Sequence, residues 1–568
     1  MCQRDCVNEQ ELFPGEPEHL VNGVKMSSRT NQGFSRYTPS LDAPPGSSSP
    51  STIFGNLDQS DRYAGEYSHQ RLYVALILLT ALFLRLYRLS SQSIWVDEML
   101  TISSSGINVP LSPIDIFDNL HGPLHSIIMF LWVKLAGDSE FALRLPSVIF
   151  SVLSMLAIYK VVLKLSDSRT AVIALTVMAV SPFHIWYAQE ARNYSMLLFF
   201  SALSFGGFLD LLSEPTRNNF WRYVLFTLAA FLSNMSAAFI VIVQDIFFLF
   251  SPRKLSLRSL VLAHVFLALL LLPWLTGMFQ RVEFHRLART APYPESEFLR
   301  GPTTSSPFAL PYTFFVFSLG YSLGPSLTEL HESIGLASFA RYAPVLIPAA
   351  LGFSLALVLG IISLRHRKRL LFLLLIWIVL PLAVVSFFAL KNFKPFNPRY
   401  VMVSYPAYVM LLAEGLLLRK RSLKGAVIRL ALCTLILVTV LVSLRNYYDV
   451  AAYGKDDFRS AARTLQAEFA PGDVVFAEGT YEPLNYYLRN TEKAITILPL
   501  YRETIGSDAR LRVFVLEKSQ DADRVWLLTS RLWDLDPEKK VPELFRQIFV
   551  IKREFHLQGV DLALLTKK

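Results

Sequence analysis

The stretch LLFLLLIWIVLPLAVVSFFAL, residues 370–390, decides the fold class of this chain. It carries no charged residue, and it is as long as the roughly 20 apolar residues that a helix needs to cross a bilayer. Similar runs lie on both sides of it. The sequence therefore predicts an α-helical polytopic membrane protein with about eleven transmembrane helices. The expected spans are 72–88, 145–165, 170–188, 195–212, 222–235, 237–251, 259–276, 343–364, 370–390, 400–418 and 427–445.

The composition also indicates a membrane protein. Of the 568 residues, 52% are hydrophobic and 18% are charged, whereas soluble domains carry about 45–50% apolar and about 25% charged residues. In a soluble protein the formal charge of +10 would raise the question of nucleic acid. Here the basic clusters lie between apolar runs and no nucleic-acid-binding motif is present. We therefore expect no nucleic-acid partner.

The two ends of the chain differ from its middle. Residues 1–71 are rich in Ser, Pro, Gly and Asn, which predicts a disordered cytoplasmic tail without a cleavable signal peptide. The three cysteines, Cys2, Cys6 and Cys433, form neither a disulfide framework nor a zinc spacing. Residues 449–568 have the composition of a soluble domain, in which β-rich runs alternate with helical stretches such as 458–469. A small extracytoplasmic α/β domain is expected there, with strands at 474–477, 525–528 and 561–565.

Basic connectors predict the sidedness. The apolar run 127–137 is too short to span, so we expect a helix lying on the membrane surface. All basic connectors then fall on one side, which the positive-inside rule makes cytoplasmic. The loops 89–144 and 277–342 fall on the other side. Within the second loop, 308–323 is apolar enough to dip into the membrane. The basic connectors are 160–169, 217–222, 253–258, 365–369 and 419–424.

Two motifs of the first outer loop could carry chemistry. Asp97 and Glu98 follow Trp95 just outside a span, where a carboxylate can act as general base or hold a metal ion. The alternative is an acidic start of an interfacial helix. His121 and His125 lie four residues apart and can share one helix face to bind metal or lipid phosphate, although such a pair can equally be structural.

Ionisable residues also stand at other outer positions. Glu190 and Arg192 lie in a turn between two spans, where ionisable groups beside hydrocarbon indicate function or interfacial anchoring. Arg85, Lys394 and Arg399 are cations on the outer side, against the positive-inside trend. Binding the phosphate of a lipid donor would explain them, and so would snorkelling to headgroups.

These motifs resemble those of a known family. Trp95-Val96-Asp97-Glu98 after a first span is similar to the acidic motif of the GT-C glycosyltransferases. The chain most resembles bacterial relatives of the protein O-mannosyltransferases and of the lipid A aminoarabinose transferase, which are glycosyltransferase family 39-like. The resemblance continues through 121–125, 137–147 and 181–194 to Arg399-Tyr400 and Pro406, and covers roughly residues 72–420. Many relatives have His-Pro-Pro-Leu-Tyr where this chain has His121-Gly122-Pro123-Leu124-His125.

The resemblance implies an inverting transfer of a sugar from a polyprenyl-phosphate donor. By analogy Asp97 is the general base or its metal-linked equivalent, Glu98 supports it, and Glu190 is the second acidic residue of the cavity. A divalent cation is used by some GT-C enzymes and not by others, so it stays open, with Asp97 and Glu98 as its ligands if it is used. The residues expected to bind the donor phosphate or substrate are Arg85, His121, His125, Arg192, Tyr194, Lys394, Arg399 and Tyr400.

Two other functions compete with this interpretation. A transporter or lipid flippase would place ionisable residues deep within spans and would show an internal inverted repeat. Here the charges lie mostly at span ends and the halves show no repeat. An inactive relative that only binds a partner would not need the Asp97-Glu98 pair. We expect a plasma (inner) membrane enzyme with an extracytoplasmic active site, acting with membrane lipid on an acceptor that the sequence does not identify.

Overall fold

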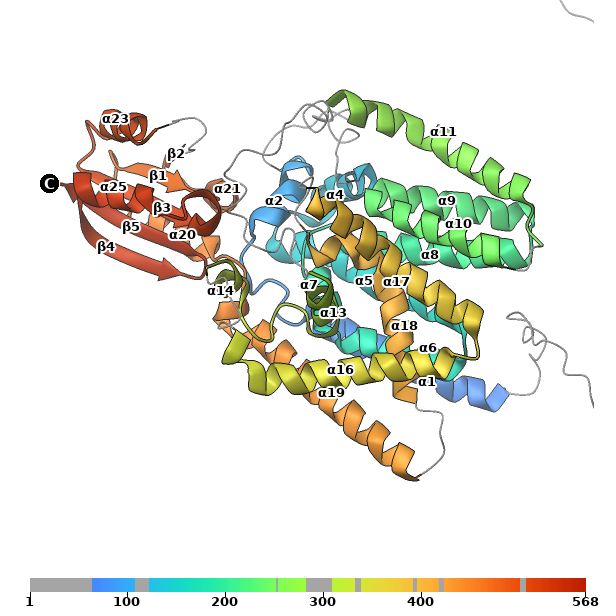
Figure 1. Cartoon of the computed structure of the whole chain (residues 1–568). Coiled ribbons are helices and arrows are strands. Elements are labelled where there is room, and N and C mark those ends of the chain that lie inside the picture. Colours follow the sequence, from blue (N-terminus) through green and yellow to red (C-terminus); the bar gives the residue numbers. More distant parts are fainter. Residues whose placement is uncertain are drawn as a thin grey trace, which may run out of the picture. The chain divides into compact units, whose positions relative to one another are not determined.

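The computed structural model describes residues 64–107, 122–251, 254–281, 309–332, 339–391, 396–417, 423–500 and 507–568. The described residues belong to one compact unit, Asn56–Lys568. Its first part is helical and its last part contains all the described strands (Figure 1). The tail 1–63 lies outside the described residues, and so do parts of both expected outer loops.

The helical part follows the predicted apolar runs. Each of the eleven predicted ranges overlaps a helix in the structure. The helices and 3-10 turns are α1 (Ala64–Leu86), α2 (Val96–Ser103), α4 (Pro123–Ala136), α5 (Glu140–Leu165), α6 (Ser168–Val180), α7 (Pro182–Ala188), α8 (Tyr194–Ser213), α9 (Arg217–Ser233), η1 (Met235–Ala237), α10 (Ala238–Phe250), α11 (Leu257–Arg281), α13 (Ala309–Leu319), α14 (Leu327–Glu332), α16 (Ala343–Leu364), α17 (Lys368–Leu390), η4 (Pro398–Ser404), α18 (Tyr405–Leu417), α19 (Leu423–Asp449) and η5 (Ala451–Tyr453).

Eleven membrane-spanning helices are not confirmed. Among the described residues, seven helices are long and apolar enough to cross a bilayer, or eight if the bent pair α6 and α7 forms one span. Length accounts for two of the three predicted spans that are not among these eight, because α9 has 17 residues and α10 has 13, whereas a full span needs roughly 20. The third is α1, which has 23 residues. The chain is an integral membrane protein, and its described residues contain seven or eight helices that meet the length and hydropathy of a full span.

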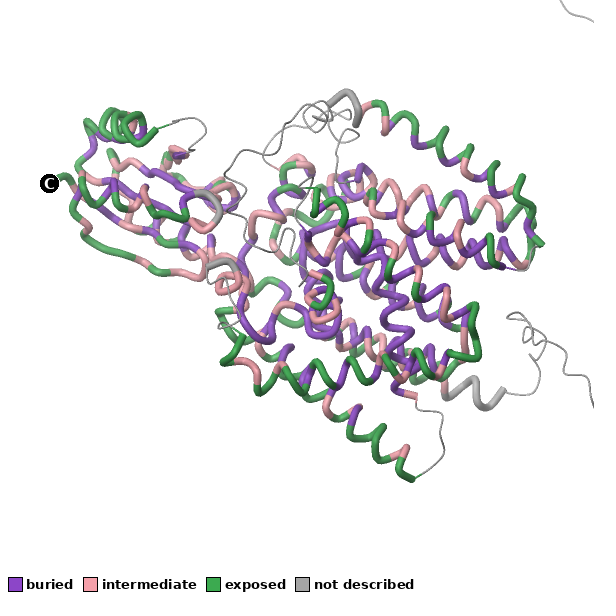
Figure 2. Tube along the Cα trace, in the orientation of Figure 1, coloured by how far each residue is buried: buried purple, intermediate pink, exposed green. Residues whose placement is uncertain are grey.

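The long helices differ in how much of their surface the protein covers. In the apolar part of α18 with its preceding turn 89% of residues are buried, whereas the corresponding value is 28% in α11 and in α16. Figure 2 shows this contrast between a buried centre and an exposed periphery. Exposed side chains of the outer helices are apolar, such as Leu269 and Leu351, as contact with lipid requires. Gly415 lets α18 approach α16 closely, because a Cβ there would lie 1.8 Å from Ala356 O.

A sharp break separates α6 from α7. The two helices meet at an angle of 60°, because Pro182 begins α7 and has no N–H to continue α6. Ser181 caps the new helix by accepting a hydrogen bond from the His184 N–H at 3.2 Å. The break turns the chain so that the next turn, containing Glu190, lies against the amino-terminal end of α8.

The two short apolar segments of the outer loops are helices that are too short to span. The predicted surface segment 127–137 lies in α4, which has 14 residues, or about 21 Å at 1.5 Å per residue. The segment 308–323 contains α13, which has 11 residues. Phe317 of α13 packs among aromatic rings of α7 and α18, with Phe183 at 4.9 Å and Tyr408 at 5.6 Å between ring centroids. This segment is thus part of the helical core.

The C-terminal part is an α/β domain, as predicted. Its sheet has the order β2-β1-β3-β5-β4, in which β1, β2 and β3 are parallel and β5 is antiparallel to both neighbours. Helices cover both faces, α20 and α21 on one and α23 and α25 on the other. The elements are α20 (Phe458–Glu468), β1 (Val474–Glu478), α21 (Glu482–Leu488), β2 (Ile497–Pro499), α23 (Asp508–Lys518), β3 (Arg524–Ser530), α24 (Leu532–Leu535), α25 (Lys540–Ile548), β4 (Phe549–Leu557) and β5 (Val560–Lys567).

Ion pairs join this domain to the helical part. The Arg459 guanidinium binds the Glu140 carboxylate at 3.0 and 2.5 Å and also donates to the Ser90 carbonyl at 2.8 Å. Arg489 binds Asp138 at 2.8 Å. Both acidic residues stand at the start of α5. Helices α20 and α21 are thus bound to two segments of the helical part, the connection between α1 and α2 and the start of α5.

Candidate active site

The predicted acidic pair opens α2, and its two members have different surroundings. Glu98 is fully buried and receives a two-pronged hydrogen bond from Arg144, at 2.8 Å on each oxygen. It also accepts the Ala191 N–H at 2.9 Å and lies 3.4 Å from Lys455 Nζ. Burial alone would raise the pKa of Glu98, but the Arg144 and Lys455 cations outweigh it and lower this pKa to about 2. Glu98 is therefore an ionised anchor whose oxygens are already occupied.

Asp97 forms an ion pair with Arg399, which brings the start of α2 to the start of η4. Its side chain stays 20% exposed. Burial opposes ionisation, but the nearby Arg399 and Arg192 guanidiniums hold the pKa of Asp97 below its usual value. The Asp97 carboxylate is therefore negatively charged and orients Arg399. The sequence predicted these two site residues separately, from distant parts of the chain.

Glu190 is the carboxylate without a partner. It is fully buried, and neither of its oxygens has a hydrogen-bond partner among the described residues. Burial raises its pKa to about 7; the Lys455 ammonium opposes this rise, and the charges of Asp97 and Glu98 add to it. A carboxyl group with a pKa of about 7 is half ionised near neutral pH, which suits a group that accepts a proton.

One cavity of about 190 Å³ joins these groups. Asp97, Glu190 and Arg399 line it together, so three of the predicted residues meet at one place. Aromatic rings enclose it, and Trp186 contacts Trp95 and Tyr321 with centroids 6.3 and 5.1 Å apart. The full lining is Trp95, Asp97, Trp186, Tyr187, Glu190, Tyr321, Leu327, Thr328, Asn397, Arg399, Ala452, Tyr453, Gly454, Lys455, Asp456, Arg531 and Trp533.

Four other predicted residues lie near the cavity or in the packing around it. Arg192 is buried and its guanidinium lies 5.8 Å from the Tyr194 ring; it acts on Asp97 by charge without lining the cavity. Tyr400 is half-buried beside Arg399, whose guanidinium is 5.5 Å from its ring. His125 is buried within α4. Two more predicted residues, His121 and Lys394, lie outside the described residues.

Arg85 has a different place from the one that the sequence predicts. Its guanidinium is fully buried in the helical part and does not line the cavity. It donates to the Met178 and Ala179 carbonyls at 3.0 and 3.1 Å and contacts Ser151 and His184 at 2.7 and 2.6 Å. At the break the Met178 carbonyl keeps only a long backbone bond of 3.4 Å from the Ser181 N–H, and Arg85 donates both to it and to the Ala179 carbonyl. The cation is explained by the bend rather than by a phosphate.

Replacing Arg85 by methionine is expected to lower the unfolding free energy by about 2–4 kcal/mol, because buried carbonyls at the α6 end lose their donors. The measurement is thermal unfolding in one detergent. Arg88→Met is the matched control, since Arg88 pairs with Asp449 where both side chains are about half exposed and such pairs contribute about 0–1 kcal/mol. Equal melting temperatures for the two variants would contradict the role of Arg85.

A roof over the site from the C-terminal domain was one possibility that the sequence left open, but no residue of that domain was predicted to line the site. Lys455, Asp456, Arg531 and Trp533 all line the cavity. The Lys455 ammonium is only 1% exposed and donates to the Gln189 carbonyl at 3.3 Å. The only signal in the sequence is the charged run Lys455-Asp456-Asp457, directly after the last apolar run. The run itself does not indicate which distant carboxylates these charges contact in the folded protein.

Asp97 and Glu98, the ligands expected if a divalent cation is used, have different partners. Asp97 faces Arg399 and Glu98 faces Arg144, so each carboxylate already has a cation. Within the described ranges, no three His, Cys, Asp or Glu side chains gather as a metal site. The arrangement there supplies charge through guanidinium and ammonium groups.

Comparisons with known proteins agree with this fold. A family model described as dolichyl-phosphate-mannose-protein mannosyltransferase matches residues 120–276. No curated protein matches the chain by sequence. Among solved structures, ArnT from Cupriavidus metallidurans in the apo state aligns with a TM-score of 0.51 and 12% identity, over 88% of this chain and 98% of that one.

Two further structures are similar. An oligosaccharyltransferase from Archaeoglobus fulgidus, tethered to an acceptor peptide, aligns with a TM-score of 0.50 and 12% identity, over 86% of this chain and 73% of that one. ArnT bound to undecaprenyl phosphate aligns with a TM-score of 0.48 and 13% identity, over 88% of this chain and 98% of that one. At these identities the likeness concerns the fold.

Proposed function

We propose, from the premise that the chain belongs to the GT-C glycosyltransferase superfamily, that it transfers a sugar from a polyprenyl-phosphate donor to an acceptor hydroxyl at the outer face of the membrane. The observation that carries this proposal is the cavity in which the unpartnered, buried Glu190 carboxylate faces the Asp97–Arg399 ion pair. It combines a proton acceptor with a cation for phosphate, as such a transfer requires.

Each group has a task in the reaction. The acceptor oxygen forms a bond to the anomeric carbon of the sugar while the bond from that carbon to the phosphate oxygen breaks. Glu190 takes the proton of the acceptor hydroxyl. Arg399 stabilises the departing phosphate, and its buried Nε has no hydrogen-bond partner among the described residues. Asp97 holds Arg399 in place. In a single displacement of this kind the anomeric configuration inverts.

An apolar cavity supports a lipid-linked donor. It has a volume of about 480 Å³ and lies between α6, α13, α16, α18 and α19. One end reaches Ser181 and Ser318 near the break before α7, and the other reaches Leu417 and Arg429. An isoprenoid chain is apolar along its whole length, so a groove with such walls suits it.

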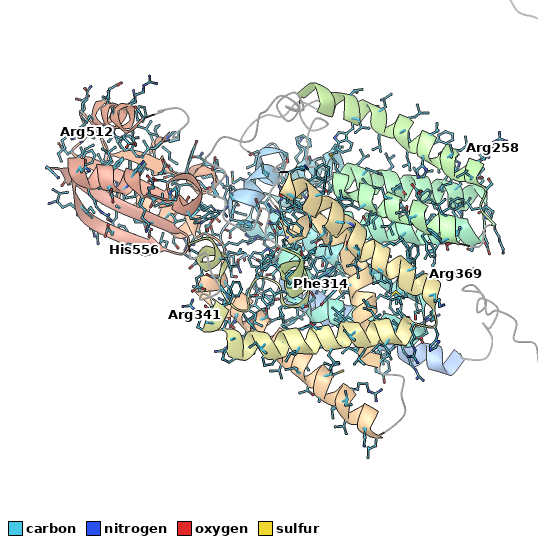
Figure 3. The ribbon with its side chains drawn as sticks, viewed as in Figure 1. Arg258, Phe314, Arg341, Arg369, Arg512 and His556 are labelled. Atoms are coloured by element: carbon cyan, nitrogen blue, oxygen red, sulfur yellow. The ribbon has the colours of Figure 1, made fainter. Side chains whose placement is uncertain are left out.

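Contacts among the basic connectors support the outward orientation. Lys164 Nζ and Arg222 Nη2 lie 2.5 and 3.6 Å from Asp210, and Arg367 donates to the Leu165 carbonyl at 2.6 Å. Figure 3 shows Arg258 and Arg369 at the same end of the helices. Helix α8 begins beside Glu190 and ends among these basic residues. The length of a full span therefore separates the basic end of the helices from the cavity. By the positive-inside rule this arrangement supports an extracytoplasmic position of the cavity.

The test is a transfer assay with the full chain in liposomes. Labelled undecaprenyl-phosphate sugars are supplied one at a time, and release of undecaprenyl phosphate is measured for wild type, Asp97→Asn and the surface control Glu517→Gln. We expect one donor to be consumed by wild type and by the control, and little by Asp97→Asn. If folded wild type consumes no donor but moves a labelled lipid across the bilayer, the flippase alternative replaces this proposal.

A further inference from the structure

The wall of the cavity that comes from the C-terminal domain carries side chains with no task in the transfer described above. Asp456, Arg531 and Trp533 line the cavity together with Asp97 and Glu190. We refer to these three residues as the C-terminal wall. They come from two separate segments of the domain, one before α20 and one directly after β3.

The fold holds the first member of this wall from behind. Asp456 packs against the turn between β4 and β5, where a Cβ on Gly559 would lie 2.2 Å from Asp456 Oδ1. Gly559 has a φ of 67°, so glycine meets both the space and the backbone conformation of that turn. The Asp457 N–H donates to the Gln558 carbonyl at 2.7 Å. The Asp456 carboxylate therefore has a fixed position.

The second member stands at the carboxyl edge of the parallel strands. Arg531 directly follows β3 and has a left-handed φ of 49°, which is uncommon for a residue with a Cβ. Ser530 donates to the Thr480 carbonyl at 2.6 Å and so ties the ends of β3 and β1 together. Ligands of open α/β sheets bind at this edge.

Asp456 and Arg531 form a pair that is only partly used. Arg531 Nε donates to Asp456 Oδ2 at 2.9 Å, with side chains 23% and 16% exposed. The two terminal nitrogens of Arg531 and Asp456 Oδ1 have no hydrogen-bond partner among the described residues. The guanidinium lies 5.5 Å from the Trp95 ring. The pair thus offers two donor groups and one acceptor beside aromatic rings.

This combination matches the surface of a sugar. A pyranose has neighbouring hydroxyl groups, which both donate and accept hydrogen bonds, and an apolar face of C–H groups. A carboxylate beside a guanidinium can bind two neighbouring hydroxyls, and indole rings such as those of Trp95 and Trp533 can pack against the C–H face. A simple phosphate would not use the Asp456 carboxylate, because two anions repel.

We propose that Asp456, Arg531 and Trp533 form a glycosyl-recognition subsite, through which the C-terminal domain selects the sugar that the enzyme handles. The proposal rests on the transferase function proposed above and deepens it. The ligand is a pyranose ring with neighbouring hydroxyls. It is carried either by the donor lipid or by a glycan acceptor, and the experiment separates these sources.

The experiment measures binding to the full chain in nanodiscs. The probes are undecaprenyl phosphate and its mannosyl, glucosyl and galactosyl derivatives, and the variants are Asp456→Asn, Arg531→Lys and Trp533→Leu. Arg512→Lys is the matched control on an exposed face of the same domain (Figure 3). For a donor sugar we expect each variant to bind the preferred sugar-bearing lipid about tenfold more weakly. Binding of the sugar-free lipid and the melting temperature should stay unchanged.

The other outcomes are also informative. If donor binding is unchanged but the KM for a glycan acceptor rises about tenfold, the subsite holds the acceptor sugar. Equal losses for sugar-bearing and sugar-free lipid would overturn the proposal, and so would unchanged binding and KM in all three folded variants. If wild type itself binds no sugar-bearing lipid, the transferase function fails and the subsite fails with it. Comparing wild type with the variants therefore distinguishes the two failures.

Discussion

Glu190→Gln is expected to reduce the transfer rate by roughly 10²–10⁴-fold, the usual contribution of a general base. The substitution keeps the size of the side chain and removes only its negative charge. Since neither Glu190 oxygen has a hydrogen-bond partner among the described residues, no existing bond there is lost and the protein should remain folded. The measurement is the rate of donor consumption at saturating donor, beside a melting curve. A folded variant with the wild-type rate would remove Glu190 from the mechanism.

The pH dependence of the transfer rate is a second test of Glu190. Glu190 must be ionised to accept a proton and its pKa is raised to about 7, so the wild-type rate should fall as the pH decreases through about 7. The charge of Asp97 contributes to that rise. The residual activity of Asp97→Asn should therefore decline at a lower pH than wild type. An inflection that stays in place in Asp97→Asn would assign it to another group.

Arg144→Met is expected to be the most destabilising of these substitutions, by about 3–5 kcal/mol. It leaves the fully buried Glu98 carboxylate with Lys455 Nζ at 3.4 Å as its nearest cation and removes the Arg144 donations to the Leu89 and Gln92 carbonyls, at 2.9 and 2.8 Å. The measurement is thermal or denaturant unfolding in detergent.

Two companion variants identify the cause of this loss. The double variant Glu98→Gln/Arg144→Met should be more stable than Arg144→Met alone, because it no longer buries a carboxylate that has lost both of its guanidinium hydrogen bonds. Arg489→Met removes a guanidinium from a partly exposed pair with Asp138 and should cost about 0–1 kcal/mol. If Arg144→Met were as stable as Arg489→Met, the buried ion pair would not be an anchor of the fold.

Hydrophobic patterning predicted the positions of the long helices well, because an apolar run in the sequence and the helix that it forms have similar lengths. The run 343–364 coincides with α16, and 370–390 lies within α17. The same patterning does not fix the number of spans, since a run such as 237–251 is apolar enough for a span but its described helix α10 has only 13 residues. The strands at 474–477 and 525–528 were also predicted correctly, from their β-branched and aromatic residues.

Only those site residues that belong to a recognisable sequence motif were predictable. Asp97, Glu190 and Arg399 were singled out and do line one cavity. Their pairing was not predictable, because sequence spacing contains no information on which distant charges meet. Arg85 was assigned to phosphate binding because a cation near the end of a span has many uses, and only the broken helix α6 explains it. Lys455 and Arg531 depend on how the C-terminal domain docks.

The burial of Lys455 has a consequence for how the protein is made. This residue follows α19, so a ribosome produces it after every helix that contributes to the acidic centre. Until then Glu98 and Glu190 lack the cation that the C-terminal segment brings to them. A nascent chain is therefore inserted in the membrane before its centre is electrostatically complete. If the proposed transfer needs this cation, a chain stopped before residue 455 would span the membrane with an acidic centre that lacks its ammonium group.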